Sequence, residues 1–153
     1  MSDEALYDRL ERQLCALLEE ERDFVANAGN FAALIRHEVP DVNWAGFYIA
    51  GPAEELVLGP FCGRPACTRI APGRGVCGAA AKQRATLVVD DVDAFSDHIA
   101  CDAASRSEIV VPIVRDDRLF GVFDVDSPVT ARFSEADRAG LERLVGVFSE
   151  SLG

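Results

Sequence analysis

The sequence has few of the features with which proteins enter membranes or bind nucleic acids. No apolar run approaches the ~20 residues that a membrane helix needs. The N-terminus is acidic and helix-like, so no signal peptide is expected. Positive charge is scarce: 15 Lys and Arg stand against 26 Asp and Glu, which gives a net charge of -11. Since phosphate groups bind to clustered basic residues, neither nucleic acid nor an anionic membrane is an expected partner.

The chain also lacks the paired cysteines of a zinc site. Its cysteines number five, none forms a CxxC pair, and Cys62 and Cys67 are separated by four residues, so zinc is not favoured even with His98 nearby. We expect a cytoplasmic protein, in which structural disulfides are rare. Cys15 lies in an apolar helical stretch and is interpreted as a core residue. The remaining thiols lie in or beside predicted loops, where some pair of them could form a reversible disulfide: Cys62, Cys67, Cys77 and Cys101.

Hydrophobic periodicity predicts the helices. Leucines at spacings of three and four predict a first helix with one apolar stripe: Leu6, Leu10, Leu14, Leu17 and Leu18. A second helix is predicted over 30–38, with Asn30 as its cap. The last begins after Ser134, with Glu135 and Asp137 in its first turn. The glycines of "PGRGVCGAAAKQR" predict a loop that opens another helix, and the backbone N–H groups there could bind a carboxylate.

Strands are predicted at "VNWAGFYIA", "EELVLGPF", "TLVVDD", "EIVVPIV" and "RLFGVFDVD". With the helices, they predict an α+β fold: a central, largely antiparallel sheet with helices packed on one face. With 153 residues, one domain is expected over 1–153, with a helical lead-in over about 1–40 and the sheet and pocket over about 43–153.

The strand alternation places polar and aromatic side chains on one face of this sheet. Trp44 and Tyr48 share a face, and so do Asp124 and Asp126; Glu108 opens the neighbouring strand and is expected to join them. Paired aspartates are also ordinary on a solvated sheet surface. The long irregular segment 90–107 favours a roofed pocket instead, suited to a small cationic or zwitterionic ligand.

The segments "NWAGFY", "GRGVCG", "DHIACDAASRSEIVVP" and "GVFDVDS", in this order, resemble the free methionine-(R)-sulfoxide reductases, which have a GAF-type fold. The resemblance implies that Cys101 is the nucleophile, Cys67 its resolving partner and Cys77 an auxiliary thiol. It implies that Trp44 and Tyr48 form an aromatic wall of the substrate site. It also assigns three carboxylates to the substrate pocket: Glu108, Asp124 and Asp126.

The implied reaction is reduction of free L-methionine (R)-S-oxide through a sulfenic acid on Cys101 and an intramolecular disulfide with Cys67. Either Glu108 or Asp126 would donate the proton. Thioredoxin or a similar dithiol would reset the enzyme, a homodimer is expected, and neither a metal nor an organic cofactor is implied. The alternative is a GAF-type domain that senses a small ligand or the redox state without catalysis.

Overall fold

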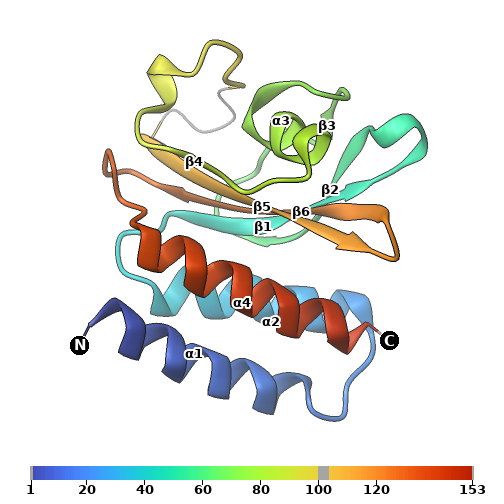
Figure 1. Cartoon of the computed structure of the whole chain (residues 1–153), viewed down its shortest axis with the longest axis vertical. Coiled ribbons are helices and arrows are strands. Elements are labelled where there is room, and N and C mark those ends of the chain that lie inside the picture. Colours follow the sequence, from blue (N-terminus) through green and yellow to red (C-terminus); the bar gives the residue numbers. More distant parts are fainter. Residues whose placement is uncertain (1, 100–103, 153) are drawn as a thin grey trace.

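A curled antiparallel sheet forms the middle layer of this computed structural model, which describes residues 2–99 and 104–152 (Figure 1). Within that part of the chain the sheet has six strands in the order β3-β2-β1-β6-β5-β4. Their bounds are β1 (Trp44–Ala50), β2 (Leu56–Cys62), β3 (Arg69–Ile70), β4 (Leu87–Val89), β5 (Ser107–Arg115) and β6 (Arg118–Ser127). Every neighbouring pair is antiparallel, as predicted, whereas the short strand β3 was not foreseen.

The helices divide unequally between the two faces of the sheet. On one face α2 (Phe24–Glu38) and α4 (Glu135–Ser151) lie against the strands, and α1 (Asp3–Leu18) packs against these two helices on the outside (Figure 1). On the other face lie α3 (Gly75–Gln83) and the segment that contains the 3-10 turn Val92–Ala94. The predicted α+β arrangement is confirmed. No helix in the described ranges is long and apolar enough to cross a membrane.

The capping side chains explain where the helices begin. Ser134 and Asp137 form a reciprocal capping box at the start of α4, as their spacing predicts. The predicted start of α2 is wrong by six residues, because Asp23 is the cap and its carboxylate accepts a hydrogen bond from Ala26 N at 2.9 Å. Asn30 therefore lies within the helix.

The face covered by α2 and α4 carries the larger apolar core. Phe31 of α2 stacks on Phe123 of β6 with ring centroids 4.4 Å apart, and Phe148 of α4 approaches Phe47 of β1 to 4.8 Å. Buried aromatic pairs of this kind contribute about 0.5–1.5 kcal/mol beyond the burial of their area. This core covers one face of the sheet and leaves polar side chains of the same strands on the opposite face.

Two expectations for α1 were wrong. Leu6, Leu10, Leu14 and Leu18 are buried, but Leu17 is 43% exposed, and Cys15 is an exposed thiol rather than a core residue. The reason is geometric: consecutive helix residues point about 100° apart, so Cys15 turns away from the stripe that Leu14 continues. Because α1 is the outermost helix, only that stripe is covered.

Candidate active site

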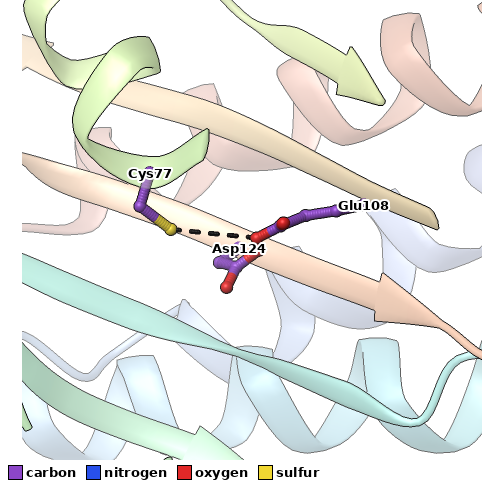
Figure 2. A group of neighbouring side chains, drawn as sticks. All are labelled: Cys77, Glu108 and Asp124. Atoms are coloured by element: carbon purple, nitrogen blue, oxygen red, sulfur yellow. Dashed lines mark hydrogen bonds between the residues drawn. The ribbon is translucent and has the colours of Figure 1, made fainter. Parts of the chain in front are cut away.

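A thiol and two carboxyl groups converge on the sheet face opposite the aromatic core. Cys77 comes from the first turn of α3, Glu108 from β5 and Asp124 from β6 (Figure 2). Their ligand atoms all lie within 4.8 Å of one another, and all three residues are buried. The Cys77 thiol points at Glu108 Oε2 across 4.0 Å, the distance drawn in Figure 2.

The strand register explains why the acids meet. Glu108 pairs with Asp126 and Val110 with Asp124 across β5 and β6, so the three acids are opposite or diagonal neighbours on one face. Trp44 and Gly46 of β1 pair with Asp126 and Asp124 on the other side of β6. The predicted alternation of polar and apolar faces is therefore confirmed in these strands.

Burial favours the protonated forms of Glu108 and Asp124. Burial, and then the charge of Asp124, raise the pKa of Glu108 well above its usual value. Burial, and then the charge of Asp126, raise the pKa of Asp124 to about 8. The Glu108–Asp124 hydrogen bond raises the pKa of Glu108 and lowers that of Asp124, so Glu108 is the member that donates.

Burial likewise raises the pKa of the Cys77 thiol, with the charges of Asp124 and Glu108 adding to the effect. A thiol whose ionisation is disfavoured in this way is a poor nucleophile at neutral pH, because the reactive species is the thiolate. Cys77 is thus a hydrogen-bond donor to the acids rather than an attacking group.

Two aromatic rings form the wall beside the acids. Trp44 and Tyr48 are each 3% exposed, and their rings stack with centroids 6.1 Å apart. Trp44 also stacks on Phe61 of β2 at 5.4 Å. Gly46 permits this arrangement, because a Cβ there would lie 2.3 Å from Phe61 Cβ and 2.8 Å from the indole. The indole therefore lies flat across its own strand, as only glycine allows.

The same two rings hold the loop that carries Cys67. The Trp44 indole N–H donates to Arg64 O at 3.0 Å, and the Tyr48 hydroxyl donates to Cys67 O at 2.9 Å. Cys67 is disulfide-bonded, whereas Cys15, Cys62 and Cys77 are free. The wall of the pocket thus also fixes the backbone of the disulfide-bonded Cys67.

An ion pair that was not predicted from the sequence holds the segment around Asp97, in the roof of the pocket, against the start of α3. Asp97 accepts hydrogen bonds from the Arg74 guanidinium at 2.8 Å and from Gly75 N at 3.0 Å. Its carboxylate therefore occupies the N–H group at the start of α3 that the sequence offered to a ligand carboxylate. Ile99 completes the contact: a Cβ on Gly75 would lie 3.1 Å from its side chain. Residues 23 apart carry no periodic signal that could have predicted this pair.

Together these groups enclose a cavity of about 50 Å³. All five predicted substrate-site residues line it: Trp44, Tyr48, Glu108, Asp124 and Asp126. Cys77 also lines it, and so do His98 and Ile99, which belong to the segment 90–107 that was predicted to roof the pocket. Cys101, the predicted nucleophile, lies outside the described residues, so its role remains a prediction.

Comparison with known proteins places these features in a family. The sequence profile of the GAF domain matches residues 13–152. The free methionine-R-sulfoxide reductase of Escherichia coli (strain K12) is 45% identical over 152 residues, which cover 99% of this chain and 92% of the relative.

Two solved structures are similar over nearly the whole chain. The X-ray structure of free methionine-R-sulfoxide reductase from Neisseria meningitidis, in complex with its substrate, is similar with a TM-score of 0.95 and 44% identity, over 99% of this chain and 91% of that one. A putative GAF sensor protein from Burkholderia vietnamiensis has a TM-score of 0.94 and 57% identity, over 99% of this chain and 96% of that one.

Proposed function

This chain belongs to the GAF domain family, with free methionine-R-sulfoxide reductases among its homologues, and we propose that it is itself a thiol-dependent reductase of free L-methionine (R)-S-oxide. The observation that carries the proposal is the buried thiol and carboxyl cluster beside two aromatic rings and a disulfide-bonded Cys67. A sensor domain needs no such combination of protonated acids and redox-active cysteine.

The first step is attack by the Cys101 thiolate on the sulfoxide sulfur. The sulfoxide oxygen takes a proton and passes from the methionine sulfur to the Cys101 sulfur while the transient sulfur–sulfur bond breaks, so methionine departs and Cys101 is left as a sulfenic acid. Glu108 is the proton donor, since burial raises its pKa well above the usual value and it donates a hydrogen bond to the neighbouring Asp124. We therefore assign the role of proton donor to Glu108 and not to Asp126, the other candidate from the sequence.

In the second step the Cys67 thiol attacks the Cys101 sulfenic acid, forming a disulfide and releasing water. Support comes from the state of the cysteines: Cys67 is disulfide-bonded, whereas the other described cysteines are free. Cys77 acts as an auxiliary, because its protonated thiol donates toward Glu108 and stabilises negative charge there once the proton has left. A dithiol such as thioredoxin then reduces the disulfide.

Substrate choice follows from the charge of the pocket. The α-ammonium of a free amino acid would donate charge-assisted hydrogen bonds to carboxyl oxygens of the acid cluster, under the ring of Trp44. A methionine sulfoxide within a peptide has no such ammonium, and its chain would meet the roof that the Asp97–Arg74 pair closes. We also propose that the protein works in the cytoplasm, as a homodimer.

The test is to incubate the reduced protein with separate (R) and (S) epimers of free methionine sulfoxide and dithiothreitol, and to quantify methionine. Methionine should appear from the (R) epimer alone. A protein that binds the sulfoxide without converting it would instead be a sensor, and the reductase assignment would fail.

A Cys67→Ser variant tests the second step. One equivalent of methionine should form per chain, because the attacking thiol is intact, but recycling by thioredoxin should be lost. In the wild type, peptide mass spectrometry after one turnover should detect a Cys67–Cys101 bridge. A Cys77–Cys101 bridge in its place would transfer the resolving role to Cys77.

A further inference from the structure

We propose that Cys77, Glu108 and Asp124 form a binding site for a borderline divalent cation such as Zn²⁺, in the same cavity that we assign to the substrate. Thiolate and carboxylate are both established ligands of this ion. The site was not foreseen from the sequence, because the three donors come from three separate elements and belong to no ligand-spacing motif.

The distances between the donors suit a single ion. In tetrahedral zinc coordination, bonds of about 2.3 Å to sulfur and 2.0 Å to oxygen place a sulfur and an oxygen ligand about 3.5 Å apart. Cys77 Sγ and Glu108 Oε2 lie 4.0 Å apart, and all three donor atoms fall within 4.8 Å of one another. Side-chain rotations that move the donor atoms by up to about 1.5 Å would bring all three to bonding distance of one ion without a backbone change.

Asp124 provides an independent reason to expect a ligand. Its Oδ1 is buried and has no hydrogen-bond partner among the residues that the structure describes, although the residue is only 5% exposed. A buried carboxylate oxygen without a partner is costly, and a cation or a donor from a ligand would satisfy it. Asp124 lines the cavity together with Glu108 and Cys77.

The charge of the cavity and the space in it also favour a cation. Asp126 lines the same cavity and adds a third carboxyl group, and no Lys or Arg is among its described lining residues. A cavity of about 50 Å³ has space for a cation with one or two waters that complete its coordination. The protein would supply three ligands and leave the fourth position open, as zinc sites accessible to a ligand do.

The experiment is a titration of the disulfide form with Co²⁺, a spectroscopic substitute for Zn²⁺, followed in the near-ultraviolet. In this form Cys67 is disulfide-bonded and cannot contribute a thiolate. We expect one equivalent of Co²⁺ per chain to produce a thiolate-to-cobalt charge-transfer band, which Zn²⁺ then abolishes by displacement.

Variants assign the band to its ligands. Cys77→Ser should remove it, and Glu108→Gln should weaken Co²⁺ binding by at least about 100-fold while keeping the volume of the side chain. Cys62→Ser is the matched control, because Cys62 is a free thiol 3.9 Å from His37 Nε2 and is the obvious competing site. Circular dichroism and thermal unfolding would verify that each variant is folded.

Absence of a thiolate band in the wild type would overturn the proposal, as would a band that survives in Cys77→Ser or disappears in Cys62→Ser. One consequence rests on the proposed function: Zn²⁺ should raise the KM for the sulfoxide without lowering kcat. The cobalt band requires no turnover, so it can fail or succeed independently of the reductase assignment.

Discussion

The two faces of the sheet are built from alternate residues of the same strands, yet they have opposite effects on stability. On β6, Phe123 and Val125 enter the aromatic core beneath α2 and α4, whereas Asp124 and Asp126 line the cavity beneath α3. The first face gains stability by burying apolar area. The second face buries carboxyl groups, which costs stability unless something pairs with them.

The core therefore supports the site, because its apolar burial offsets the cost of burying the carboxyl groups. A buried acid cluster persists only when the surrounding fold overrides its cost, and the rings that stack behind it provide that support. Changes on the cavity side should therefore alter activity with little loss of stability, and changes on the core side should do the reverse.

The largest expected effect on activity is that of Cys101→Ser. Turnover of free L-methionine (R)-S-oxide should fall by at least about 1,000-fold, because a serine hydroxyl is a poor nucleophile toward sulfur at neutral pH. The measurement is methionine release with dithiothreitol as reductant. Cys15→Ser, which changes an exposed thiol on α1, should retain full activity. Substantial turnover by Cys101→Ser would show that the nucleophile is wrongly assigned.

The largest effect on the core side is expected from Phe123→Ala. Removing a fully buried ring that stacks on Phe31 should lower the free energy of unfolding by about 3–5 kcal/mol, as measured by urea denaturation of the reduced protein. Val25→Ala, at a 65% exposed position of α2, should change it by less than about 0.5 kcal/mol. A loss below about 1 kcal/mol in Phe123→Ala would mean that this core does not support the site.

The contrast between the faces could be predicted from the sequence because a strand repeats every two residues. That period placed Trp44 with Tyr48, and Asp124 with Asp126, without knowledge of the fold. Features that depend on residues far apart in the chain could not be predicted in this way. The contact of Asp97 with Arg74 is one of them, and the approach of Cys77 to Glu108 is another.

Helix boundaries were predicted less well than faces, for a local reason. Asp23 follows a run of charged residues, "EEER", so nothing in its surroundings distinguishes it as the cap of α2, whereas Asn30 precedes a clear apolar run. The exposure of Cys15 also escaped prediction, because the number of helices that cover α1 is a property of the whole fold.

Blocking the substrate's ammonium group tests the acid cluster on the cavity side. The N-acetyl derivative of L-methionine (R)-S-oxide cannot form charge-assisted hydrogen bonds, which contribute roughly 1.5–3 kcal/mol each, so kcat/KM should fall by at least about 100-fold. The O-methyl ester keeps the ammonium and separates its contribution from that of the carboxylate. Comparable kcat/KM for the free and acetylated sulfoxides would contradict the roles of Glu108, Asp124 and Asp126.

The smallest effect expected is a change in how stability depends on pH. The pKa of Asp124 is about 8 in the folded protein, against an ordinary value of 3.8, so between these values the folded state holds a proton that the unfolded state has lost. The contribution of this proton to the free energy of unfolding is fully present below about pH 4 and is lost as the pH rises through about 8.

Asp124→Asn cannot ionise. From pH 5 to pH 8 the free energy of unfolding of this variant should therefore decline less than that of the wild type, and the difference should exceed about 1 kcal/mol. Asp116→Asn makes the same chemical change in the exposed turn between β5 and β6, and should leave the wild-type slope intact. Urea denaturation of the three reduced proteins across this range measures the slopes. Parallel curves for Asp124→Asn and the wild type would show that this carboxyl group is not buried at a cost, and the contrast between the two faces would then be one of shape alone.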